Sequence, residues 1–123
     1  MDKGLYIAAF LLPKRLRLRV GALGSFRFRA GVYLYVGSAQ RNLNARVERH
    51  GRRNKPLHWH IDYLSAKARM LGAILVRGSR RQECSLAREV ATVLPQTVPG
   101  FGSSDCGCEG HLFYGGPSFD CVE

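Results

Sequence analysis

The sequence predicts an α+β fold: a small central β-sheet of about three core strands, antiparallel or mixed, flanked by helices and extended by a basic β-hairpin. Hydrophobic residues recur with a period of two through residues 1–36 and at helical spacing after Gly37. A length of 123 residues with 46% hydrophobic and 23% charged residues is typical of one domain. We therefore expect residues 1–123 to form a single domain, with residues 95–123 packed on it as a tail containing Gly, Pro and Cys.

The first predicted strand, residues 5–12, is an apolar run that ends at Pro13. A run this short cannot cross a bilayer, and no small-residue cleavage site follows it. We interpret it as a buried strand rather than an export signal. Residues 32–36 form a charge-free run of β-branched and aromatic residues, which predicts the central strand of the sheet.

Between these two strands, residues 16–20 and 26–29 alternate apolar residues with arginines, and residues 21–24 supply a glycine-containing turn. This pattern predicts a hairpin with one apolar face and one face of guanidinium groups. The charged face carries Arg15, Arg17, Arg19, Arg27 and Arg29. It either contacts phosphates, which we favour, or protects a sheet edge by its charge.

The spacing of apolar residues predicts helices over residues 40–50, 58–68 and 84–94. Ser38 or Asn42 can cap the first of them, and Gly51 follows its end. The remaining expected elements are a short strand over residues 73–76, a basic loop over 77–81 and an extended segment over 111–114.

Charge is unevenly distributed along the chain. The 19 Lys and Arg exceed the 9 Asp and Glu by ten, and most of the excess lies in residues 14–29 and 41–55. A basic face of this kind most often meets phosphate, as nucleic acid first and as an anionic membrane second. A merely solvated surface is the alternative.

The four cysteines, at positions 84, 106, 108 and 121, are too few and too clustered for a secreted disulfide framework. We expect a cytoplasmic protein that has no membrane partner.

The most informative stretch combines a strand end with a helix start. A strand that ends in Tyr35-Val36-Gly37 places a phenol at its end, and the glycine lets a phosphate approach the backbone. Arg46 lies in the helix that follows. These parts suit a phosphodiester site.

Together with Gly4-Leu5-Tyr6, these residues resemble the two short motifs and the catalytic arginine of the GIY-YIG nuclease superfamily. Further blocks match one of its branches, a small family of unassigned function whose members also occur fused to archaeal endonuclease III. The matching blocks are residues 33–39, 46–50, 58–64, 83–84, 99–108 and 111–113. Two departures are Leu5 in place of the usual isoleucine and the long separation of the two motifs, which the hairpin causes.

The resemblance implies a sheet of three antiparallel strands that holds one divalent metal ion, Mg²⁺ or Mn²⁺. It implies that Tyr6 acts on the attacking water, that Tyr35 fixes phosphate or water, and that Arg46 stabilises the transferring phosphoryl group. Because a free tyrosine has a pKa near ~10, Tyr6 needs Arg46 and the metal nearby to act as a base. Glu83 in the third helix is the favoured metal ligand, and Glu89 is the alternative.

Nucleic-acid contacts are expected from the hairpin arginines and from a second set around the first helix. The second set is Gly37, Ser38, Arg49, His50, Arg52, Arg53 and Lys55. His50 either meets a phosphate or complements the helix dipole. Trp59 is interpreted as core rather than as a base-stacking platform.

Two further groups have both a structural and a chemical interpretation. His58 and Asp62 lie one helical turn apart and either share a proton or metal or bond to the backbone at the helix start. Cys106, Cys108 and His111 provide three zinc ligands within six residues, although their spacing is not the usual one for a zinc knuckle.

We expect a metal-dependent endonuclease that hydrolyses phosphodiester bonds, with DNA favoured over RNA and a link to DNA repair. The alternative is a non-catalytic nucleic-acid-binding accessory module that keeps the fold and the basic face. A zinc-binding or redox protein would require functional cysteines in the tail.

Overall fold

The computed structural model describes residues 2–95, 98–102 and 110–117. Its elements in chain order are β1 (Gly4–Leu12), β2 (Leu16–Arg19), the 3-10 helix η1 (Gly21–Leu23), β3 (Ser25–Phe28), β4 (Gly31–Ala39), α1 (Leu43–His50), α2 (His60–Ser65), β5 (Arg69–Val76), the 3-10 helix η2 (Arg80–Gln82), α3 (Glu83–Ala91) and β6 (Leu112–Gly116). The predicted α+β class is confirmed.

The central sheet has four strands rather than about three, in the order β5-β1-β4-β6, and each neighbouring pair is antiparallel. The fourth strand is β6, which comes from the tail and pairs with β4. β1 and β4 are central, which explains their nearly continuous apolar sequences. Their register places Tyr6 opposite Gly37 and Ala8 opposite Tyr35, so the two predicted motifs lie side by side.

The arginine-rich hairpin forms as predicted, as the separate two-stranded sheet β2-β3. Leu16 pairs with Phe28 and Leu18 with Phe26, and these side chains pack against the core. The arginines of the opposite face are exposed.

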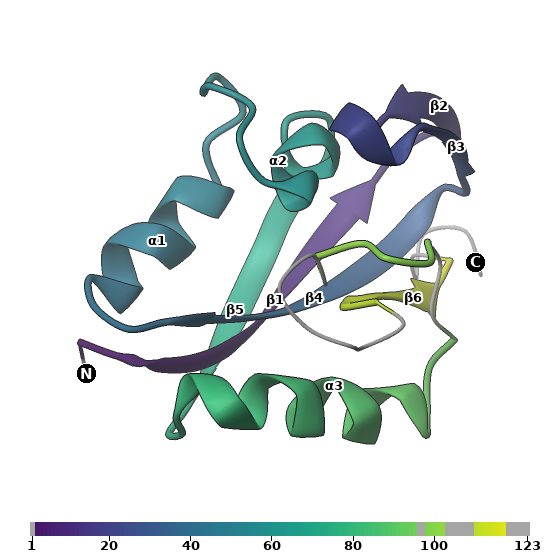
Figure 1. Ribbon diagram of the computed structural model, residues 1–123. Helices are drawn as coiled ribbons and strands as arrows, with labels where there is room; N and C mark the ends of the chain where they lie inside the picture. The colour runs from purple at the N-terminus through teal and green to yellow at the C-terminus, as the bar shows by residue number, and fades with distance from the viewer. Residues whose placement is uncertain (1, 96–97, 103–109, 118–123) are drawn as a thin grey trace.

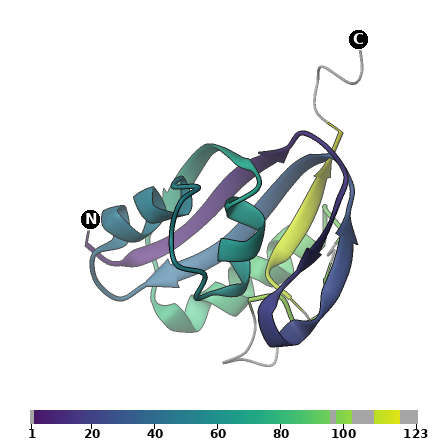
Figure 2. The same ribbon diagram turned by 90° about the horizontal axis from the view of Figure 1, so that it is seen from above.

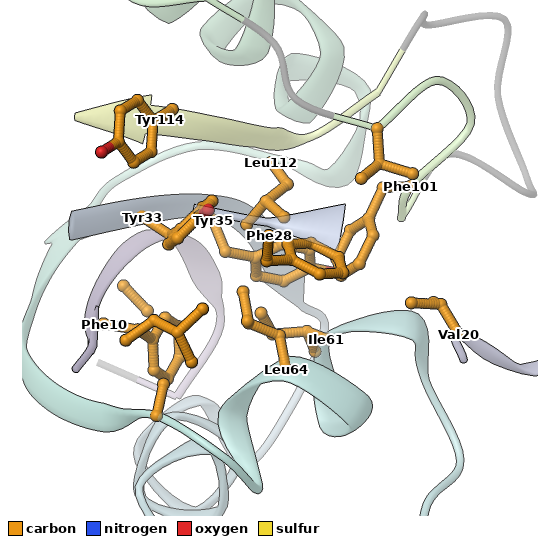
Figure 3. Close-up of a cluster of buried hydrophobic side chains, with 14 of the residues drawn as sticks. Phe10, Val20, Phe28, Tyr33, Tyr35, Ile61, Leu64, Phe101, Leu112 and Tyr114 are labelled. Atoms are coloured by element: carbon orange, nitrogen blue, oxygen red, sulfur yellow. The ribbon is translucent and has the colours of Figure 1, made fainter. Parts of the chain in front are cut away.

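Helices cover both faces of the sheet (Figure 1). Seen from above, α1, α2 and the hairpin lie in a row along one face, with α3 behind the sheet (Figure 2). The larger core lies on the side of α2 and the hairpin, where Phe10, Phe28, Ile61, Leu64 and Phe101 are completely or almost completely buried (Figure 3). A smaller cluster of Val36, Ala87 and Phe113 joins α3 to the sheet.

The helices are shorter than their apolar patterns predict. α1 begins at Leu43 because Asn42 adopts a left-handed conformation with φ of 55° and interrupts the helix. α2 begins at His60 because Trp59 is extended, and Asp62 accepts the N–H groups of His58 and Trp59 as a cap. α3 covers residues 83–91 and not 84–94.

The two outer strands are longer than predicted. β5 begins at Arg69 rather than at residue 73, because it pairs with β1 through an irregularity at Ala9 and Phe10. β6 covers residues 112–116 rather than 111–114. No helix in the described part of the chain is long and apolar enough to cross a membrane.

Candidate functional site

A cleft opens where the start of β1, the end of β4, α1, the start of α2 and the loop between β5 and α3 meet. Its volume is about 1770 Å³. Tyr6, Tyr35, Arg46 and Glu83 all line it. The four residues predicted to be catalytic therefore come together in one place.

Tyr6 is almost completely buried, and its ring occupies the space beside Gly37 on the neighbouring strand. A Cβ atom at Gly37 would overlap the Tyr6 ring and its hydroxyl oxygen. Gly37 lines the cleft, where a phosphate is predicted to approach it, and it also leaves room for the Tyr6 phenol. Burial raises the pKa of Tyr6 above its ordinary value, and the nearby charge of Arg46 opposes this rise only in part.

The Tyr6 hydroxyl is hydrogen-bonded to Nε2 of His50 at 2.7 Å. His50 is 1% exposed and lines the cleft, so the predicted phosphate contact could be made only inside the cleft. Burial is the main cause that lowers its pKa to about 4, with a further contribution from Lys55. Its Nδ1 has no hydrogen-bond partner among the described residues. No catalytic role is predicted for His50 from the sequence, yet it is hydrogen-bonded to Tyr6.

Tyr35 is buried between Tyr6, His50 and Phe101, with ring centroids 6.3, 5.9 and 6.2 Å away. Burial raises its pKa well above the ordinary value, and the charges of Glu83 and Asp62 raise it further. Both motif tyrosines are therefore neutral phenols at neutral pH.

Arg46 is held at the cleft by two contacts. Its Nη1 donates to the backbone carbonyl of Ser38 at 3.0 Å, and its guanidinium carbon lies 4.7 Å from the centre of the Trp59 ring. Among the described residues, no carboxylate forms an ion pair with Arg46. Its remaining N–H donors can therefore meet an anion in the cleft.

Glu83 is the first residue of α3 and the metal ligand favoured from the sequence. The Ser38 hydroxyl donates to Oε1, and Oε2 lies 2.9 Å from Nδ1 of His111. Burial alone would raise the pKa of Glu83, but His111 and Ser38 hold it below its ordinary value. Glu89, the alternative, is exposed and does not line the cleft. Ser38 therefore contacts the carboxylate and also lines the cleft, where nucleic acid is predicted to bind.

The side chains of Arg49 and Lys55 form hydrogen bonds within the protein. Their predicted role in nucleic-acid binding is therefore corrected. Arg49 forms two hydrogen bonds, of 2.7 and 3.1 Å, with the completely buried Asp62. The Lys55 side chain is 3% exposed and donates to the Ser65 hydroxyl and to two carbonyls at the end of α1. For His58 and Asp62, the structural interpretation holds, since Asp62 binds backbone N–H groups and Arg49.

The other predicted phosphate contacts remain on the surface. Arg52 is exposed and lies 3.6 Å from Glu48, and Arg53 is exposed and donates to the carbonyl of Lys67 at 3.4 Å. On the hairpin, the guanidinium of Arg29 lies over the ring of Tyr114 at 4.0 Å. Arg17 and Arg27 face each other across the two strands.

Several basic residues that the sequence analysis did not single out line the cleft. They are Lys3, Arg41, Arg77, Arg80 and Arg81. The signal was present, because a loop with three arginines sits between a strand and the helix that supplies Glu83. We had interpreted that segment only as a basic loop.

The residues predicted to bind zinc can be followed only in part, because Cys106 and Cys108 lie outside the described residues. His111 is buried beside Glu83, and its Nε2 lies 4.0 Å from Sγ of Cys84. Within the described ranges, no group of three His, Cys, Asp or Glu side chains can hold a metal ion.

A family model described as "Domain of unknown function DUF123" matches residues 5–122. The chain therefore belongs to this family. Searches among curated proteins and among solved structures found no match.

Proposed function

We propose that this DUF123 domain is a nuclease of the GIY-YIG type, which uses a divalent metal to hydrolyse phosphodiester bonds in nucleic acid, with DNA favoured over RNA. The observation that carries the proposal is that Tyr6, Tyr35, Arg46 and Glu83 line one cleft. These residues are far apart in the sequence, and the resemblance to the GIY-YIG superfamily implies that they act together. The chemistry of each residue in the cleft suits a separate part of the reaction.

Tyr6 and His50 form the proton-accepting pair. With a pKa of about 4, His50 is neutral at neutral pH, and the buried Tyr6 keeps its proton. Tyr6 therefore donates to Nε2, which leaves the imidazole proton on Nδ1. When water attacks phosphorus, its proton passes to the Tyr6 oxygen while the phenol proton passes to His50 Nε2. The P–O bond to the leaving oxygen breaks, and that oxygen takes a proton from solvent.

Arg46 stabilises the negative charge that builds up on the transferring phosphoryl group. Its contacts with Ser38 and Trp59 hold the guanidinium in place before substrate binds, so little reorganisation is needed. Tyr35, next to Tyr6, positions the water or a phosphate oxygen through its hydroxyl.

Glu83 is suited to hold the metal. Mg²⁺ is commonly bound by one or two carboxylates, with water and substrate phosphates completing the shell. Glu83 is ionised, and a carboxylate has about four acceptor positions, so the bonds from Ser38 and His111 leave room for a metal. When bound, the metal would polarise a phosphoryl oxygen and lower the pKa of bound water.

A second candidate function is that of a non-catalytic nucleic-acid-binding module, and one observation favours it. Burial raises the pKa values of both motif tyrosines, and both oxygens of Glu83 already have partners. Such a site is stable without a metal and can bind phosphate through Arg46 alone.

A cleavage assay distinguishes the two functions. Labelled duplex, nicked, branched and single-stranded DNA and RNA are incubated with Mg²⁺, Mn²⁺ or EDTA. We expect metal-dependent cleavage that Glu83→Gln, Arg46→Ala and Tyr6→Phe each reduce at least about a hundredfold, as expected when a catalytic group is removed. Glu89→Gln is the matched control, since it removes an exposed carboxylate from the same helix.

Binding is measured in parallel by fluorescence anisotropy in EDTA. A nuclease loses cleavage but keeps binding in Glu83→Gln. If the wild type binds all the substrates tested without cutting any of them, the accessory function replaces the nuclease.

A further inference from the structure

The loop between β5 and α3 places three arginines at the rim of the cleft. The sequence alone assigned no function to these arginines. Arg77, Arg80 and Arg81 all line the cleft and are exposed. The 3-10 helix η2 (Arg80–Gln82) leads directly into Glu83, so this loop lies beside the proposed metal ligand. The rim is therefore adjacent to the reacting centre.

Lys3 and Arg41 add two exposed basic side chains from other segments. With Arg46, the cleft has six basic residues and only two acidic ones, Asp2 and Glu83. The Asp2 carboxylate already has a hydrogen-bond partner, because it accepts the N–H of Asn42 just before α1. The excess positive charge of the cleft therefore favours an anionic ligand.

No carboxylate in the described part of the chain forms an ion pair with Arg41, Arg77 or Arg81. In this respect these three arginines differ from Arg49, which is bound to Asp62, and from Arg52, which lies near Glu48. Exposed guanidinium groups around a catalytic cleft suit the bidentate binding of phosphate oxygens.

The aromatic residues point to a duplex rather than a single strand. Proteins that bind single strands stack bases on exposed aromatic side chains. None of the described Phe, Tyr or Trp side chains is fully exposed, and the Trp59 ring is contacted by the guanidinium groups of both Arg46 and Arg49. The cleft therefore offers charge for a backbone but no free ring for a base.

The hairpin carries a second group of exposed arginines, Arg15, Arg17, Arg19, Arg27 and Arg29. Its turn lies next to the cleft region, because Gly21 faces the Tyr63 hydroxyl of α2 and Leu23 packs against Gly100, two residues before Gly102 at the cleft. The hairpin and α2 share one face of the sheet (Figure 2). Arg17 opposite Arg27 is an unfavourable like-charge pair unless an anion lies between or over the two groups.

We infer that Arg77, Arg80, Arg81 and Arg41 bind the phosphate backbone of a nucleic-acid duplex around the scissile bond, and that the hairpin arginines bind the same duplex farther along. This inference rests on the proposed function and specifies its substrate. It adds the loop of residues 77–81 to the phosphate contacts expected from the sequence.

The test is duplex binding in EDTA, measured by anisotropy over a range of salt concentrations. A triple variant, Arg77→Gln, Arg80→Gln and Arg81→Gln, is compared with a matched triple of exposed residues outside the cleft and the hairpin, Lys67→Gln, Arg69→Gln and Arg88→Gln. Both remove three positive charges. Because each phosphate contact contributes about 0.9 to the slope of log K against log salt, we expect the rim variant to lower the slope by about 2–3 and to weaken binding at least about tenfold. The matched triple should change both much less.

DNA duplex, RNA duplex and the separate single strands are the probes, and circular dichroism verifies folding of each variant. Equal losses in the two triple variants would show an effect of net charge and overturn the inference. Single strands that bind the wild type as tightly as the duplex would overturn the duplex assignment. A rim variant that binds like wild type, while the wild type cleaves, overturns this inference alone. A wild type that binds none of the probes overturns the proposed function as well.

Discussion

At the scale of single residues, burial determines the protonation states of three side chains in the cleft. It is the largest cause of the raised pKa values of Tyr6 and Tyr35 and of the lowered pKa of His50. The neutral form of each group is favoured. Tyr6 and His50 are therefore both neutral and are joined by a hydrogen bond.

The lowered pKa of His50 predicts how stability depends on pH. The pKa is 6.5 for a free imidazole and about 4 in the folded protein, so between these values the unfolded chain binds a proton that the folded chain does not. His50 therefore destabilises the fold progressively as pH falls from 6.5 towards 4. Between pH 7 and pH 5 its contribution is on the order of 2 kcal/mol.

Urea unfolding at pH 7 and pH 5 measures this effect. We expect His50→Gln to lose less stability on acidification than wild type, because glutamine does not titrate. The control is His58→Gln, which replaces an exposed histidine at the cleft. A wild-type pH dependence in His50→Gln would contradict the assigned pKa.

The buried network around Asp62 predicts a large loss of stability when its charge is removed. Asp62 is 0% exposed and binds Arg49 through both carboxylate oxygens, and two backbone N–H groups donate to it as well. Asp62→Asn leaves the positive charge of Arg49 without its partner, so we expect a loss on the order of 3 kcal/mol in the free energy of unfolding.

The matched control is Glu48→Gln, because the pair of Glu48 and Arg52 is 3.6 Å apart with side chains that are 75% and 65% exposed. An exposed pair of this kind contributes between zero and about 1 kcal/mol. Similar losses in the two variants, measured by chemical unfolding, would show that the Asp62 network does not stabilise the fold.

At the scale of elements, the antiparallel pairing of β1 with β4 brings the two tyrosine motifs together. The register places Tyr6 opposite Gly37, and only a residue without a Cβ atom leaves room for the phenol. The glycine therefore positions Tyr6 for its hydrogen bond with His50.

We expect Gly37→Ala to displace the Tyr6 ring, to lower cleavage at least about tenfold and to cost about 1–3 kcal/mol in stability, as overpacking does. Gly72→Ala is the matched control, since a Cβ atom at Gly72 on β5 meets nothing within 4 Å. Single-turnover cleavage and thermal unfolding are measured for both variants. If Gly37→Ala is as active and stable as wild type, Gly37 does not position Tyr6.

The sequence predicted the elements whose patterns are local. The alternation of Arg17 and Arg27 with apolar neighbours predicted the hairpin, and the charge-free run around Tyr35 predicted the central strand. It did not predict the length of β5, because that length depends on pairing with β1. It also did not predict the end of α2, because that end depends on where the chain must turn.

The same distinction holds for the site. The resemblance of the two motifs to those of a known superfamily pointed to Tyr6, Arg46 and Glu83, which all line the cleft. The sequence pattern misassigned Lys55, whose burial depends on the packing of α2, and it missed the partnership of His50 with Tyr6. Burial and long-range contacts are properties of the folded chain, and no local pattern encodes them.

At the scale of the whole molecule, the two edge strands of the sheet differ in burial, because Leu112, Phe113 and Tyr114 of β6 are buried whereas most of β5 is exposed. β6 ends beside the hairpin, where the Tyr114 hydroxyl donates to the carbonyl of Ala30. At the other edge, Leu71, Ile74 and Leu75 of β5 are 48%, 64% and 38% exposed to solvent. Residues 70–76 include no charged residue and no proline.

Natural sheets usually protect edge strands with lysine, proline or a covering segment, and an exposed apolar edge is a site of aggregation. We expect the isolated domain to self-associate at high concentration, and Ile74→Lys to reduce this self-association. Val93→Lys is the matched control, because it adds the same charge at a 77% exposed apolar residue outside the sheet. Light scattering against concentration measures both variants. A large effect of Ile74→Lys alone identifies the β5 edge as the cause, because added charge by itself would improve both proteins equally.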